Sequence, residues 1–215
     1  KGWFSASTAG SCFRKQYYNI NGYDGTQPDE KSMRLLRLGT IVHADIADAF
    51  ERYREQFESQ ELQLFVEHKV KLKEYNVVGH LDIGVYDKST HNITVTDVKT
   101  SHSYKWKMLF GRYPDKNPSV NYYLQVATYG LGLMHELDED IDSINLSLTW
   151  YKKDDSLLRT QKVNNEWIDY AIIYWTDLNE ALEDGNLPEI GSENVPVYDW
   201  ECKYCPYHKL HCEGK

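Results

Sequence analysis

Residues 78–85 read Val-Gly-His-Leu-Asp-Ile-Gly-Val, and residues 93–100 read Ile-Thr-Val-Thr-Asp-Val-Lys-Thr. The segment between them, 87–91, is rich in turn formers, so the two stretches are expected to be strands of an antiparallel hairpin. Side chains alternate between the two faces of a strand, which puts Asp97 and Lys99 on the same face. The hairpin can then bring Asp82 beside Asp97.

Hydrophobic periodicity predicts regular elements on both sides of this hairpin. In chain order they are a helix over 31–57, strands over 62–72, 76–86 and 92–100, a helix over 119–136, strands over 144–150 and 157–163, and a helix over 165–183. The tail, 184–215, is expected to be irregular. This order predicts an α/β fold, a mixed β-sheet flanked by helices, with a cysteine-rich C-terminal tail.

The length and composition fit a single domain over residues 1–215. No apolar run approaches the roughly 20 residues that cross a bilayer, so no membrane association is expected. The first ten residues lack the apolar stretch of a signal peptide, which favours a cytoplasmic protein.

The net charge of −9 argues against a nucleic-acid partner, because phosphate binding depends on Lys and Arg. The stretch 99–116 departs from this trend, with five basic residues against one acid and with aromatic residues interleaved. A basic, aromatic loop can hold a nucleic-acid strand, so Tyr104, Trp106 and Lys107 are candidate DNA contacts. A solvated surface loop is the alternative.

The acids and the lysine of the hairpin suggest metal chemistry. Two neighbouring carboxylates, Asp82 and Asp97, would each resist ionisation. A bound Mg²⁺ or Mn²⁺ removes that conflict, and it can polarise a phosphodiester and activate water. Lys99 would then position the water and neutralise developing charge. The alternative is a surface salt bridge between Asp97 and Lys99.

The pattern Gly-His-Leu-Asp at 79–82, followed by Asp-Val-Lys-Thr at 97–100, resembles the PD-(D/E)XK nuclease superfamily. Two more motifs resemble its RecB-like branch: Leu-Gly-Thr-Ile-Val-His at 38–43, and Gln-Val-Ala-Thr-Tyr at 125–129. Leu81 stands where the nominal pattern has proline. Glu67 is a weak match to an acid that sometimes precedes the motif strands.

The resemblance implies a restriction-endonuclease-like fold and a DNA exonuclease, more than an endonuclease, in phage or prokaryotic DNA processing or recombination. The substrate it implies is DNA with a single-stranded end. Its implied metal ligands, for one or two Mg²⁺ or Mn²⁺ ions, are His43, Asp82, Asp97 and the carbonyl of Val98. Its implied catalytic set is Asp82, Asp97, Lys99, Gln125 and Tyr129. In that set Gln125 and Tyr129 steady the lysine and the scissile phosphate.

Four cysteines bracket these motifs: Cys12 near the start, and Cys202, Cys205 and Cys212 near the end. Such residues can share one metal centre, whereas disulfides are disfavoured in an intracellular chain. The spacing fits zinc, with His208 and His211 as substitute ligands, or an iron–sulfur cluster. The arrangement resembles that of iron–sulfur nucleases, including AddB-type nucleases and CRISPR-associated exonucleases. That resemblance implies a [4Fe–4S] cluster joining the N-terminal segment to residues 202–212.

Two other classes of protein stay open at this point. One is a non-catalytic DNA-end-binding subunit that acts with recombination or CRISPR-adaptation proteins. The other is a zinc-stabilised interaction module whose acidic pair is accidental. An intact Asp82, Asp97 and Lys99 set argues against the first, and the brown colour of an iron–sulfur protein would exclude the second.

Overall fold

The computed structural model describes residues 2–112, 120–137, 141–194 and 199–214. Its elements, in chain order, are β1 (Phe4–Ser5), the 3-10 helix η1 (Ala6–Thr8), α1 (Phe13–Ile20), α2 (Glu30–Arg52), α3 (Arg54–Glu58), β2 (Leu62–Leu72), β3 (Val77–Asp87), β4 (Asn92–Ser101), α4 (Ser103–Phe110), α5 (Val120–Leu137), β5 (Ser143–Lys152), β6 (Leu158–Val163), α6 (Trp167–Ala181) and α7 (Asp199–Tyr204).

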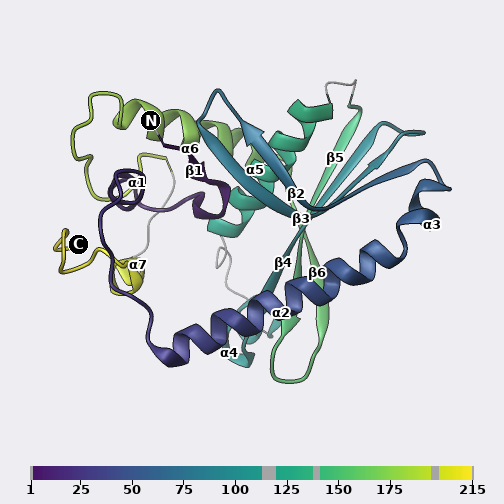
Figure 1. Ribbon diagram of the computed structural model, residues 1–215, viewed down its shortest axis with the longest axis horizontal. Coiled ribbons are helices and arrows are strands. Elements are labelled where there is room, and N and C mark those ends of the chain that lie inside the picture. Colours follow the sequence, from purple (N-terminus) through teal and green to yellow (C-terminus); the bar gives the residue numbers. More distant parts are fainter. Residues whose placement is uncertain (1, 113–119, 138–140, 195–198, 215) are drawn as a thin grey trace.

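The strands form one mixed sheet of six, in the order β1-β3-β4-β5-β6, with β2 also paired to β3. The β3–β4 pair is antiparallel, which confirms the predicted hairpin, and β4 runs parallel to β5. Helices flank this sheet, so the predicted α/β class is confirmed (Figure 1).

Helix α5 occupies the centre of the core. From Tyr123 to Leu133 every residue of it is buried, as expected of a helix covered on all sides. It packs between the sheet and α6, and the alternating apolar residues of β5 supply buried side chains on the sheet. In Figure 1, α5 and α6 lie together beside the sheet, while α2 crosses the lower part of the view.

Several predicted boundaries are wrong. The helix expected over 31–57 is two helices, because α2 ends at Arg52 and α3 begins at Arg54. The basic stretch expected as a loop is helix α4 from Ser103 to Phe110. Tyr113, Asp115, Lys116 and Ser119 from the predicted loop and helix lie outside the described residues.

The N-terminal elements β1, η1 and α1 were not predicted, and the tail is not wholly irregular, because it contains α7. These elements are too short for periodicity to indicate them, and tertiary contacts hold them. The Tyr18 hydroxyl of α1 donates to the carbonyl of His211 at 2.6 Å, and the rings of Tyr18 and Tyr207 lie 5.2 Å apart. The two ends of the chain therefore pack against each other.

None of the helices described is both long and apolar enough to cross a bilayer.

Candidate active site

The β3–β4 ladder stops at the site predicted from sequence. Its pairs run from Asp87 with Asn92 to Ile83 with Thr96, and the next opposed residues are Asp82 and Asp97. There the carboxylate of Asp82 accepts a hydrogen bond from the backbone amide of Val98 at 2.5 Å. Further along, β3 pairs with β1 instead of β4. The two strands thus separate at Asp82 and Asp97, and we call this point the fork.

Asp97 and Lys99 form a buried ion pair that helix α5 holds in place. Lys99 Nζ lies 2.6 Å from Asp97 Oδ2 and donates to Gln125 Oε1 at 3.0 Å. The Gln125 amide nitrogen donates to Asp97 Oδ1 at 3.2 Å and lies 3.1 Å from the Tyr129 hydroxyl. The side-chain exposure of Asp97 is 1%, so this is no surface salt bridge. The structure therefore brings Asp97, Lys99, Gln125 and Tyr129 into one network.

Burial dominates the electrostatics of this network. It raises the pKa of Asp97 to about 6, although the nearby charge of Lys99 acts in the opposite direction. The negative charge of Asp82 adds to the rise. Burial also raises the pKa of the Tyr129 phenol well above its usual value, so Tyr129 acts as a neutral hydrogen-bonding group. The ammonium of Lys99 additionally lies 4.9 Å from the ring centre of Tyr122.

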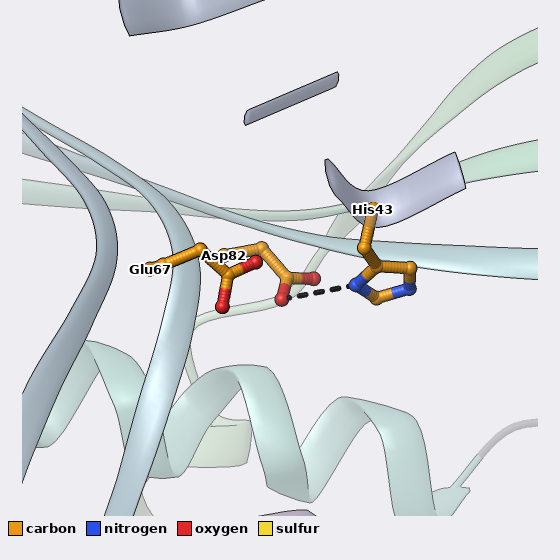
Figure 2. A group of neighbouring side chains, drawn as sticks. All are labelled: His43, Glu67 and Asp82. Atoms are coloured by element: carbon orange, nitrogen blue, oxygen red, sulfur yellow. Dashed lines mark ion pairs between the residues drawn. The ribbon is translucent and has the colours of Figure 1, made fainter. Parts of the chain in front are cut away.

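A second group of side chains includes Asp82 and is drawn in Figure 2. His43 of α2, Glu67 of β2 and Asp82 of β3 place one ligand atom each within 4.8 Å of one another. His43 Nδ1 lies 3.3 Å from Asp82 Oδ1. The predicted ligands His43 and Asp82 thus come together, whereas Asp97 is not in this group because its carboxylate is turned to Lys99 and Gln125.

The chemistry of this group fits a hard divalent cation. Partial burial and the charge of Asp82 raise the pKa of Glu67. The hydrogen bond with Asp82 raises the pKa of His43, against the effect of burial. The charge of Asp82 contributes to both shifts. Two carboxylates and an imidazole are suitable donors for Mg²⁺ or Mn²⁺.

The sequence pattern gave only a weak indication of Glu67, and the structure places it in the site. It lies within β2 between the pairs Val66–Ile83 and His68–Leu81, opposite Asp82, yet its φ is +45°. A left-handed backbone costs a non-glycine residue about 1–2 kcal/mol, and such strain gathers at functional sites. No sequence pattern indicates a left-handed residue inside a strand, so only the fold reveals how this carboxylate meets Asp82 and His43.

Gly79 explains one position of the Gly-His-Leu-Asp motif. A Cβ at Gly79 would lie 2.6 Å from the Cβ of Ala6 and 2.8 Å from Cε1 of Tyr129. Both distances are too short for real atoms, so this position needs glycine if η1 and the Tyr129 ring are to approach β3. Gly79 thereby lets Tyr129 reach the amide of Gln125.

The candidate DNA contacts lie on α4, directly after β4. The Tyr104 side chain is 78% exposed, and Lys107 is exposed as well. Trp106 instead packs against the core, with its ring 4.9 Å from that of Phe110 and with Lys152 at 6.0 Å from its centre. Tyr104 and Lys107 therefore present free surface to a ligand, while Trp106 is largely occupied by packing.

All four cysteines line one cavity between α1 and the C-terminal segment, and none forms a disulfide. Burial raises the pKa of the Cys205 thiol. His208 also lines the cavity, and its Nε2 lies 3.1 Å from the Glu213 carbonyl. His211 turns away, with Nε2 2.9 Å from the Asp24 carbonyl. The fold thus brings together cysteines that are far apart in the sequence.

Comparison with known proteins identifies the class. The profile of the PD-(D/E)XK nuclease superfamily matches residues 43–210, and the chain belongs to that superfamily. No curated protein sequence matches the chain.

Solved structures share the fold, and two of them illustrate the likeness. The crystal structure of SSO0001 has a TM-score of 0.51 and 16% identity, covering 100% of this chain and 88% of its own. A protein from Eubacterium rectale named as a "putative exonuclease" has a TM-score of 0.54 and 14% identity, covering 98% of this chain and 89% of its own. At these identities the likeness concerns the fold alone.

Proposed function

We propose that this protein is a divalent-metal-dependent deoxyribonuclease that degrades DNA from an end. The proposal rests on two groups of side chains that meet at the fork, where β3 and β4 separate. On one side, His43, Glu67 and Asp82 place donor atoms within 4.8 Å of one another. On the other, Gln125 fixes the buried pair of Asp97 and Lys99.

The metal-binding residues would be His43, Glu67 and Asp82, with Asp97 and the carbonyl of Val98 completing the set on the other side of the fork. When bound, a divalent ion polarises the phosphodiester and lowers the pKa of water. The hydrogen bond from the Val98 amide holds the Asp82 carboxylate in position.

Lys99 would position the attacking water molecule. Its Nζ is anchored by Asp97 at 2.6 Å and by Gln125 at 3.0 Å. An ammonium fixed this way can orient a water molecule and offset negative charge on the phosphate as attack proceeds. Tyr129 contributes by holding the Gln125 amide, and Gly79 leaves the room for its ring. This network argues against a subunit that only binds DNA ends, since binding alone requires no such lysine.

We further propose that the protein acts as an exonuclease in phage or prokaryotic DNA processing. Its support is the resemblance to RecB-like nucleases and the name of the Eubacterium rectale neighbour. Tyr104 and Lys107, both exposed on α4, are proposed to contact the DNA strand. Recombination or CRISPR-adaptation proteins are the partners that the same resemblance suggests.

The four-cysteine cavity is proposed to hold a [4Fe–4S] cluster. Four cysteines line the cavity, and a Cys₄ set is suitable for zinc or for a cluster. The choice of a cluster is supported by the resemblance of the cysteine arrangement to that of iron–sulfur nucleases. Its role would be to hold α1 against the C-terminal segment, which stabilises the fold.

The test is hydrolysis of end-labelled single-stranded and double-stranded DNA in Mg²⁺ or Mn²⁺. Asp97→Ala and Lys99→Ala should lose activity, while Lys69→Ala, which removes an exposed lysine of β2, should keep it. Mononucleotide products from the first time point would support an exonuclease, and internal fragments would support an endonuclease. The nuclease proposal fails if Asp97→Ala cleaves as fast as the wild type.

A further inference from the structure

One face of α2 carries exposed apolar residues that the described elements leave uncovered. Leu38, Ile41 and Ala44 lie on this face, and Leu38 and Ile41 are 39% and 55% exposed. Residues three and four apart share a helix face, so these three form a short apolar strip. The helix packs on β2, β3 and β4 with its other side, where Val42 is buried. An apolar strip left in water marks an interaction surface.

Charged residues continue the same face at both ends of the apolar strip, with opposite signs. Arg34 and Arg37 lie toward the N-terminus of α2, and Asp45 and Asp48 lie toward its C-terminus. All four residues are exposed, and their spacing keeps them on the side of the strip. Among the described residues, Arg34 has only a weak contact with Glu30 at 3.5 Å, and the other three form no ion pair. The charges at both ends are therefore available to a partner.

The order of residues on this face is symmetric about Ile41. Three residues from Ile41 in either direction lies an apolar residue, and four or seven residues away lies an arginine on one side and an aspartate on the other. The matched positions are Leu38 with Ala44, Arg37 with Asp45, and Arg34 with Asp48. When two such helices run antiparallel and cross at Ile41, each arginine meets an aspartate and the apolar residues meet one another. The face is thus complementary to itself.

We infer that a second copy of this chain docks on this face, in an antiparallel pair of α2 helices related by a two-fold axis at Ile41. A two-fold interface uses the same surface on both copies, so it requires a face that is complementary to itself. The two arginines of each copy lie against the two aspartates of the other, on either side of an apolar centre. Contact residues spaced three and four apart are the pattern by which nearly antiparallel helices pack.

A second copy fits this face better than a nucleic acid or an unrelated protein. A DNA strand would pair with the arginines, but Asp45 and Asp48 would repel its phosphates. An acidic protein would meet the same repulsion, and a neutral one would leave the charges without partners. The dimer also forms on the side of α2 away from His43, because two residues along a helix turn the side chain by about 200° from Ile41. The inference is therefore independent of the proposed nuclease function.

The experiment measures the mass of the protein in solution by analytical ultracentrifugation, at up to ~100 µM because an interface of one helix pair belongs to the small, weak class. The wild type should form a dimer, and added salt should shift it toward monomer, since exposed charge pairs are screened. Ile41→Asp places like charges against each other at the two-fold axis and should remove the dimer. Ile173→Asp makes the same change at a 39% exposed position of α6 and should leave the dimer intact.

Charge reversal distinguishes this arrangement from any other dimer. Replacing both Arg34 and Arg37 by glutamate should weaken self-association by at least about tenfold, because each charge pair then repels. Replacing both Asp45 and Asp48 by arginine should have the same effect. When the two variants are mixed in equal amounts, every pair is again of opposite charge, so a heterodimer should form about as tightly as the wild-type dimer.

Three results would overturn the inference. The first is a wild type that stays monomeric at the highest concentration, and the second is a dimer that survives Ile41→Asp. The third is a mixture of the two charge variants that does not associate, although circular dichroism shows that each variant keeps its fold.

Discussion

Replacing Glu67, a proposed metal ligand with a strained backbone, by glycine separates the effect on stability from the effect on metal binding. Glu67 has a φ of +45° within β2, which costs about 1–2 kcal/mol for a residue with a Cβ. Glycine removes this strain but adds about 0.5–1 kcal/mol of backbone entropy cost. Loss of a carboxylate that faces Asp82 also relieves repulsion. In metal-free buffer we therefore expect Glu67→Gly to be about as stable as the wild type, or up to about 1 kcal/mol more stable.

In Mg²⁺ or Mn²⁺ the wild type should instead be more stable than Glu67→Gly. A metal at roughly 100 times its Kd stabilises the wild type by about 2.7 kcal/mol. For a chain of this length that is a rise in Tm of roughly 5–10 °C. If Glu67→Gly binds the metal about a hundred times more weakly, the same metal concentration stabilises it by only about 0.4 kcal/mol, a rise in Tm of roughly 1–2 °C. Thermal unfolding with and without metal measures both quantities.

Glu61→Gly is the matched control. Glu61 is an exposed glutamate with a φ of +61°, just before β2, and it is not among the residues proposed to bind the metal. Its replacement should relieve similar strain while leaving the metal-induced rise in Tm at the wild-type value. If Glu67→Gly keeps the full rise, Glu67 is not a ligand. If it alone loses several kcal/mol without metal, the strain argument is wrong.

Three further substitutions test other parts of the site. Gly79→Ala should cost about 1–3 kcal/mol of unfolding free energy and reduce activity, because the new Cβ displaces the Tyr129 ring; full activity at unchanged stability would contradict the packing described. Gln125→Leu should leave Lys99 without its amide partner, lowering kcat by about tenfold or more with KM little changed, as steady-state kinetics would measure. Cys205→Ser should abolish the brown absorbance of an iron–sulfur protein and lower Tm; a colourless wild-type protein would refute the cluster, and a soluble, fully active variant with unchanged melting would refute its stabilising role.

The hairpin was predictable because its signal is local. Alternating β-branched residues and a short turn determine the positions of Asp82, Asp97 and Lys99, and helical spacing puts Gln125 and Tyr129 on one face. The network among these residues follows once α5 packs on the sheet. Those predictions depend on strand alternation and helical spacing, which the sequence shows directly.

Two features depended on the fold and could not be predicted. The left-handed backbone of Glu67 comes from the pairing of β2 with β3, and no residue type there indicates it. Helix α4 was expected to be a loop because its eight residues show no clear apolar stripe, and contacts with β4 decide its structure. The structure also shows that Trp106 is used for packing, which its sequence neighbours did not indicate.

The most direct test of the account is the initial rate of single-stranded DNA cleavage in Mn²⁺ by the wild type and by Asp82→Asn. The substitution keeps the size of the side chain while it removes the charge that faces His43 and Glu67. We expect the wild type to cleave, EDTA to stop it, and Asp82→Asn to lose at least about a hundredfold in rate. Equal rates for the two proteins, or cleavage that persists in EDTA, would contradict a metal-dependent site at this fork.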